Sequence, residues 1–290
     1  MRLPSSFRRP IVQLSVFFLG FSSTLTQLTL MRELLGVYAG NELVFGVLLG
    51  NWLFLAGIGS WLGRRAAGTR HPLALLAWSQ LGLAVLPVIL LFAVRGLRRF
   101  VFIPGAEVDM TATVWSSLVL LAPYVVLSGC LLPLLSAWLP ESPTAQGIGQ
   151  AYLLDCLGSA VGAAVFSVVL VPWANPYQIV YVPAFCNILL AAAGAMLLQR
   201  EALLAAGLTS AGILVTIPLA VSLDTATTRW EYPGQEVVFR GYSPYGCVIV
   251  TEARGQYHVL ENGVPLFMTD DQAAAEEAVH YALAQRPQAK

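Results

Sequence analysis

Three ionisable side chains lie in otherwise apolar stretches, where a charge is costly and is therefore a candidate for function. Asp155 lies in YLLDCLGSAVG, and Arg32 and Glu33 lie together in TLMRELLGVYAG. Two kinds of role fit them. Arg32 could pair with Asp155 or with Glu33 and fix helix packing, because buried charges need partners. Alternatively, the three could line a path for a small cation or a proton.

The composition places these residues in a membrane protein. Hydrophobic residues make up 57% of the 290 residues and charged residues only 11%, whereas soluble domains have about 25% charged residues. We therefore expect the lipid bilayer to be the main partner. The 16 basic and 16 acidic residues cancel, so nothing points to nucleic acid. The four cysteines form no CxxC pattern, and no metal site is predicted.

Apolar runs of about 20 residues match a hydrocarbon core about 30 Å thick. We place seven such runs, at residues 11–31, 43–63, 73–94, 113–138, 148–171, 177–198 and 202–222. The predicted fold class is mainly α: a polytopic transmembrane helix bundle of about seven spans over residues 1–222, followed by a small domain over residues 223–290. A homo-oligomer is one of the partner arrangements that the sequence allows.

Arginines indicate the orientation, because Lys and Arg favour cytoplasmic loops. With a cytoplasmic N-terminus, seven arginines fall inside and three fall outside. The inside set is Arg2, Arg8, Arg9, Arg64, Arg65, Arg70 and Arg200, and the outside set is Arg95, Arg98 and Arg99. We therefore expect a multi-pass inner (plasma) membrane protein whose N-terminus is cytoplasmic. Seven spans then place the C-terminal domain outside the cytoplasm.

Small residues at helical spacing predict close helix contacts. Gly158 and Gly162 share a helix face with Asp155, so we expect Asp155 to face protein rather than lipid. A second stripe of small residues lies in the second span and consists of Gly46, Gly50, Gly57, Gly59 and Gly63.

The segment after Leu223 changes character. Short strands are predicted at residues 236–240, 246–252, 256–260 and 264–268, and Asn262-Gly263 is typical of a two-residue hairpin turn. Thr269 with Gln272 suggests a capping box, and the alanine-rich run that follows predicts one helix, which Pro287 ends. The C-terminal domain is thus predicted to be a small β-meander plus one helix.

The stretch YSPYGCVIVTEARGQYHVLENGVPLFMTDDQAAAEEAVHYAL, together with LTLMRELLGVYAGNEL and YLLDCLGSAVG, resembles the membrane-fused spermidine synthase-like proteins of bacteria. In that family a hairpin segment precedes a methyltransferase-like domain. That domain binds decarboxylated S-adenosylmethionine and transfers its aminopropyl group to putrescine. The resemblance implies that residues 223–290 correspond to the hairpin segment that begins the synthase domain.

The resemblance also implies candidate substrate-binding residues, namely Tyr245, Asp270, Glu276 and His280. Alanine occupies the positions of a Tyr-His pair in the family pattern, so much of an amine pocket is missing. The residues alone offer a plainer interpretation. Glu276 and His280 form an i, i+4 pair on a solvated helix, and Asp270 supplies charge at a helix N-terminus.

The sequence contains no glycine-rich turn between a strand and a helix, the arrangement that cradles a nucleotide cofactor. We therefore expect no catalytic residues, no cofactor and no enzymatic activity in this chain alone. The resemblance implies a truncated form, or a membrane half that acts with a separately encoded methyltransferase-like catalytic chain. The alternatives are a small-cation or polyamine transporter and a structural membrane subunit.

Overall fold

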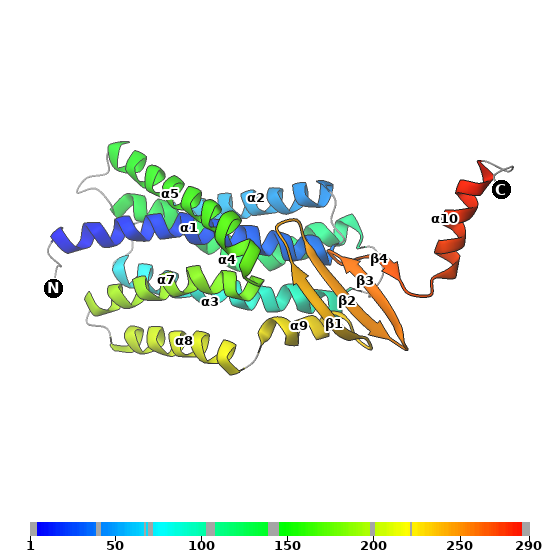
Figure 1. Ribbon diagram of the computed structural model, residues 1–290. Coiled ribbons are helices and arrows are strands. Elements are labelled where there is room, and N and C mark those ends of the chain that lie inside the picture. The colour runs from blue at the N-terminus through cyan, green and yellow to red at the C-terminus, as the bar shows by residue number, and fades with distance from the viewer. Residues whose placement is uncertain are drawn as a thin grey trace.

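The computed structural model describes residues 5–38, 42–66, 68, 72–102, 108–138, 145–197, 201–220 and 222–285. Long helices run alongside one another and form a bundle, and a four-stranded sheet lies at one end of it (Figure 1). The bundle helices are α1 (Ser5–Val37), α2 (Glu42–Ala66), α3 (Pro72–Phe100), α4 (Met110–Trp138), α5 (Ala145–Val165), α7 (Pro176–Leu197) and α8 (Glu201–Ala220).

Six of the described helices are long and apolar enough, by length and composition, to cross a membrane. They overlap most of each of the first six predicted spans. Helix α8 overlaps most of the seventh, which was placed at residues 202–222. The protein is therefore a multi-pass membrane protein. The predicted fold class is confirmed, and about seven spans is approximately right.

Glycines allow two pairs of helices to approach closely. On α5, a Cβ atom at Gly158 would lie 1.9 Å from the carbonyl oxygen of Phe17 on α1, and a Cβ at Gly20 would lie 2.1 Å from the carbonyl oxygen of Asp155. The predicted seam on α5 is therefore a contact with α1. Gly59 and Gly63 pack in the same way on the backbone of α4.

The other half of the predicted glycine stripe on α2 was wrong. Cβ atoms at Gly46, Gly50 and Gly57 would meet nothing within 4 Å. These three glycines are exposed, whereas Gly59 and Gly63 are buried. Gly46 and Gly50 each precede one of the buried pair by 13 residues, a spacing that places them on nearly opposite sides of a helix.

The fifth span is interrupted before its end. The π-helix η1 (Phe166–Leu170) follows α5 and leads into the short α6 (Val171–Trp173). Pro172 has no backbone N–H and its ring clashes with the preceding turn, so the backbone widens ahead of it. The N–H of Val171 accordingly donates to Phe166, five residues back. Two residues, Ala174 and Asn175, separate α6 from α7, which begins at Pro176.

The C-terminal domain begins with α9 (Leu223–Glu231) and continues as an antiparallel meander of order β1-β2-β3-β4. The strands are β1 (Glu236–Tyr242), β2 (Cys247–Ala253), β3 (Gln256–Glu261) and β4 (Val264–Met268), and α10 (Gln272–Ala284) follows. All four predicted strands are confirmed. Asn262 and Gly263 have φ values of 50° and 83°, as a type I′ turn requires.

The predicted capping box was wrong. Asp271 caps α10 by accepting a hydrogen bond from the N–H of Ala274 at 3.0 Å. Thr269 instead accepts from the N–H of Tyr257 at 2.7 Å, across the sheet. The side chain of Thr269 is therefore bonded to β3, and α10 begins three residues later, at Gln272.

The sheet and the first turn of α1 lie at opposite ends of the bundle (Figure 1). Among the described residues, seven long helices (α1 to α5, α7 and α8) precede α9, and six of them are candidate membrane spans. Arg2, Arg70, Arg200 and Pro287, which entered the sequence predictions, lie outside the described residues.

Candidate functional site

The centre of the site is Arg95, which is fully buried where the bundle meets the C-terminal domain. Its Nε donates to Glu33 of α1 at 3.0 Å. Its Nη1 donates to the Asp224 carbonyl at 3.1 Å and to Thr227 at 2.6 Å. Its Nη2 donates to the Asp224 carboxylate at 2.7 Å and to Tyr242 at 3.2 Å. A guanidinium has five N–H donors, and all five are used.

A second arginine completes this group of charges. Arg240 of β1 lies 3.9 Å from Glu33 and 3.9 Å from Glu231, and it donates to Thr228. Glu231 also lies 3.5 Å from Arg95. We call Arg95, Arg240, Glu33, Asp224 and Glu231 the ion-pair cluster. Two cations face three carboxylates, and they tie α1, α3, α9 and β1 together.

Burial sets the protonation behaviour of Glu231, which lies outside the membrane spans. Burial raises the pKa of Glu231 above its ordinary value, and Arg240 and Arg95 oppose that rise only in part. A carboxyl whose pKa is raised by folding binds its proton more tightly in the native state. The stability linked to this proton is therefore present below the ordinary pKa of 4.5 and is lost as the pH rises through the folded value.

Replacement of Glu231 with glutamine is expected to remove this loss, because glutamine resembles the protonated acid at every pH. As the pH rises from mild acid to neutral, the free energy of unfolding should shift in favour of Glu231→Gln relative to wild type. Denaturant unfolding of the two proteins in the same detergent across this range measures the shift. A difference that stays constant with pH would contradict the assignment.

Two more arginines hold the turns of the sheet against the helix ends. Arg32 of α1 donates to the carbonyl of Ser243 at 2.6 Å. Arg98 of α3 donates to the carbonyls of Gly263 at 3.0 Å and of Gly36 at 3.3 Å. The β1–β2 turn and the β3–β4 turn are thus both attached to the bundle.

The structure brings Arg32 and Glu33 to this junction, but it pairs them differently from the prediction. Glu33 binds Arg95 rather than Arg32, and Arg32 binds a backbone carbonyl. Asp155 is half-buried on α5, along the contact with α1. Among the described residues Asp155 forms no ion pair, so the predicted pairing of Arg32 with Asp155 was wrong. Transport by these residues stays a prediction.

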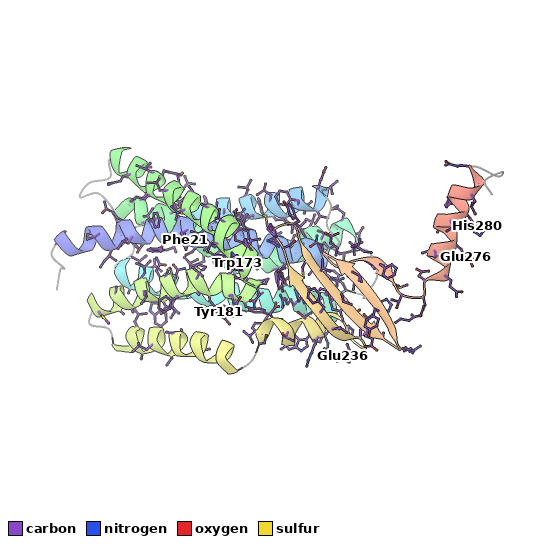
Figure 2. All side chains as sticks on the ribbon, in the orientation of Figure 1. Phe21, Trp173, Tyr181, Glu236, Glu276 and His280 are labelled. Atoms are coloured by element: carbon purple, nitrogen blue, oxygen red, sulfur yellow. The ribbon has the colours of Figure 1, made fainter. Side chains whose placement is uncertain are left out.

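The candidate substrate residues are not gathered into one site. Tyr245 is 92% exposed in the β1–β2 turn. The register places that turn next to Asn262, whereas β4 leads to Asp270 at the other end of the sheet. Glu276 and His280 lie on α10, which extends away from the sheet (Figure 2). All four side chains are exposed, and the proposed substrate role of each stays a prediction.

Within the described ranges, no three His, Cys, Asp or Glu side chains are placed to hold a metal ion. The carboxylates of the ion-pair cluster are occupied by arginines instead. What this arrangement does chemically is to fix the position of the sheet on the bundle.

Sequence reasoning missed most of the ion-pair cluster. It assigned Arg95 to an outside loop, but α3 continues to Phe100 and buries Arg95 near its end. Asp224, Glu231 and Arg240 were not singled out. One signal could have found two of them. Asp224 and Glu231 are seven residues apart on α9 and lie on one face with Thr227 and Thr228, a polar face suited to meet buried charge.

No protein-family model matches the chain, and no curated protein or solved structure matches it either.

Proposed function

We propose that this protein is a membrane anchor whose sheet and helix α10 bind a soluble catalytic partner, and that the chain has no catalytic activity alone. The sequence resemblance suggests that the partner is an aminopropyltransferase-like domain. One observation carries the proposal. The apolar side chains Val279, Tyr281 and Leu283 of α10 are 55%, 68% and 50% exposed. This helix extends beyond the bundle (Figure 2), so the lipid that surrounds the bundle does not account for its apolar surface.

Strand β4 supports the same conclusion. Its neighbouring residues Leu266 and Phe267 point to opposite faces of the sheet, and they are 61% and 60% exposed. A strand that is apolar on both faces is typical of a sheet covered on both sides. β4 is also an edge strand, so its unpaired backbone groups can accept a strand from a partner.

The opposite edge strand, β1, and two turns of the sheet are attached to the bundle. The ion-pair cluster fixes β1, and Arg32 and Arg98 fix the two turns. A binding surface held in one orientation loses less conformational entropy when its partner docks. The sheet is thus fixed to the bundle through β1 and its turns, while the side chains of β4 and α10 stay exposed. A membrane anchor for a soluble partner requires this arrangement.

Substitution of Val279 and Leu283 with aspartate is expected to weaken partner binding by at least about 100-fold, because two apolar anchor residues are replaced by charges. The partner to use is a soluble aminopropyltransferase-like protein encoded in the same genome. Biolayer interferometry on the full chain in nanodiscs measures the affinity. Glu277→Gln, also on exposed α10, is the matched control and should bind as wild type does.

Unchanged binding by the double variant, or no binding by wild type, would count against this function. A reporter fused after Gln285 tests the partner's chemistry separately. An adenosyl cofactor is available in the cytoplasm, so this partner requires a cytoplasmic sheet, whereas the arginine distribution favours a cytoplasmic N-terminus. A reporter outside the cytoplasm would exclude an adenosyl-dependent partner.

A further inference from the structure

A line of polar side chains runs along the buried face of α1. It consists of Ser15, Ser22, Thr26, Thr29 and Glu33, and we call it the polar seam. The four hydroxyl residues are at most 2% exposed. Their spacing of seven, four, three and four residues keeps them on one helix face. That face meets other helices of the bundle, since Asn187 of α7 donates to Ser22 Oγ at 2.9 Å and Glu33 binds Arg95 of α3.

Several polar atoms along this face have no hydrogen-bond partner among the described residues. They are Ser15 Oγ, Asn187 Oδ1 and both amide atoms of Gln80. Gln80 and Asn187 are fully buried. Gln80 of α3 is flanked by Leu76 and Leu83, which pack in the same cluster as Val16 and Leu19 of α1. Buried polar atoms in native proteins are nearly always satisfied, often by ordered water.

The spacing of these groups suits water. A helix rises about 1.5 Å per residue, so the groups from Ser22 to Glu33 are roughly 4 to 6 Å apart along the axis. A water molecule with two hydrogen bonds of about 2.8 Å spans such an interval. The longer interval from Ser15 to Ser22 is roughly 10 Å. Gln80 precedes Arg95 by 15 residues on α3, and Arg95 binds Glu33 of α1, so we infer from the helix rise that Gln80 lies at about the level of this interval.

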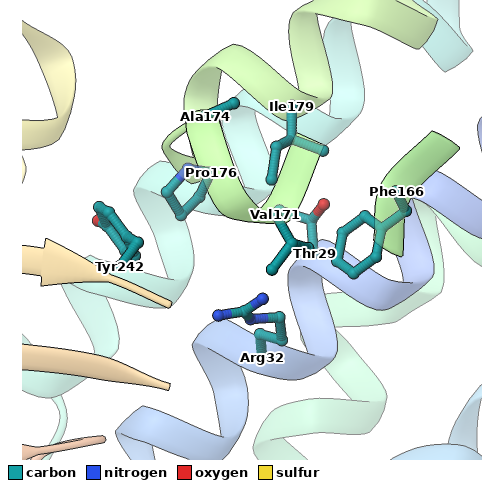
Figure 3. A pocket seen from close by; sticks show the side chains of 8 residues that line it. All are labelled: Thr29, Arg32, Phe166, Val171, Ala174, Pro176, Ile179 and Tyr242. Atoms are coloured by element: carbon teal, nitrogen blue, oxygen red, sulfur yellow. The ribbon is translucent and has the colours of Figure 1, made fainter. Parts of the chain in front are cut away.

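A cavity at the sheet end of the seam offers space for such a molecule. Its volume is about 10 Å³, and Thr29, Arg32 and Tyr242 line it together with apolar side chains from η1, α6 and α7 (Figure 3). This is close to the smallest volume that holds one water. Arg32 donates to Ser243, and a guanidinium has further N–H donors to offer.

We propose that the polar seam binds a row of internal water molecules, one of them in the cavity beside Thr29 and Arg32. The lack of charged groups along most of the seam indicates a neutral ligand. Between Ser15 and Thr29 the seam offers only hydroxyl and amide groups, and at its sheet end Glu33 is already paired with Arg95, so this carboxylate is not free to bind a cation. This inference is independent of the proposed docking function.

Gln80→Leu tests the proposal, because leucine has a similar volume but cannot bind water. If water is bound, the variant removes a hydrogen-bond partner of that water and leaves the other polar groups around it poorly satisfied. The melting temperature of the full chain in nanodiscs should then fall by about 2 °C or more. If the seam is dry, leucine removes two unsatisfied atoms. An unchanged or higher melting temperature therefore overturns the proposal. Thr209→Val, an exposed hydroxyl on α8, is the control and should leave the melting temperature unchanged.

Radiolytic hydroxyl labelling gives a readout that needs no change at Gln80. Tyr124 is fully buried and donates to the Ser22 carbonyl at 3.1 Å, so bulk solvent does not reach it. Water bound beside Thr26 should cause Tyr124 to be oxidised in wild type and much less in Thr26→Val, whereas Thr26→Ser should retain the labelling. Absence of Tyr124 labelling in the wild-type protein overturns the proposal.

Discussion

Replacement of Arg95 with leucine is expected to lower the free energy of unfolding by about 3 to 5 kcal/mol, the largest effect we predict. The substitution removes all five donated hydrogen bonds. It leaves Glu33 and Glu231 with Arg240 as their remaining ion-pair partner, and Asp224 with the hydroxyl of Tyr242. Uncompensated carboxylates in a buried position are strongly destabilising. Denaturant unfolding in detergent, with tryptophan fluorescence as the signal, measures the change.

The matched control is Arg99→Leu, because Arg99 is exposed near the end of the same helix. Its effect should stay within about 0.5 kcal/mol. Addition of Asp224→Asn to Arg95→Leu should restore part of the lost stability by removing one unpaired charge. Equal effects of Arg95→Leu and Arg99→Leu would show that the ion-pair cluster does not hold the domains together.

The second large effect is expected at the contact between α1 and α5. Gly158→Ala should destabilise the protein by about 3 kcal/mol, at the upper end of overpacking effects. The new Cβ would lie 1.9 Å from the Phe17 carbonyl oxygen, and a backbone atom cannot move aside as a flexible side chain does. The two helices must therefore separate along their contact.

Gly50→Ala provides the comparison, because a Cβ there meets nothing within 4 Å. Alanine favours a helix over glycine by about 0.5 to 1 kcal/mol, so this variant should be unchanged or slightly more stable. Unfolding of both variants under the same conditions measures the contrast. A stable Gly158→Ala protein would contradict the close approach of α1 and α5.

Local features were predicted well from the sequence. The strands and the Asn262-Gly263 turn depend on side-chain alternation and on the φ values of two adjacent residues, which neighbours along the chain determine. Apolar length likewise predicts a span, because every backbone group in lipid must bond within its own helix. These features need no knowledge of distant residues.

Contacts between charged residues that are distant in the chain were predicted poorly. Arg32 was expected to meet Asp155 or Glu33 and instead meets a backbone carbonyl of the sheet. Arg95 was expected in a loop and is the most enclosed charge in the ion-pair cluster. The reason is that a charged side chain near the end of a span has several carboxylates within reach in principle. Only the packing of α9 and β1 selects among them.

The sequence by itself determined that this is a membrane protein of several spans with a β-meander and a helix after them, because hydrophobic length, alternation and turn chemistry act over a few residues. The tertiary structure alone decided that Glu33, Arg95 and Asp224 meet, that Tyr245 lies far from α10, and that the hydroxyls of α1 form one buried face directed at other helices. Such contacts join residues distant in the chain, and they depend on how whole helices pack rather than on local preference.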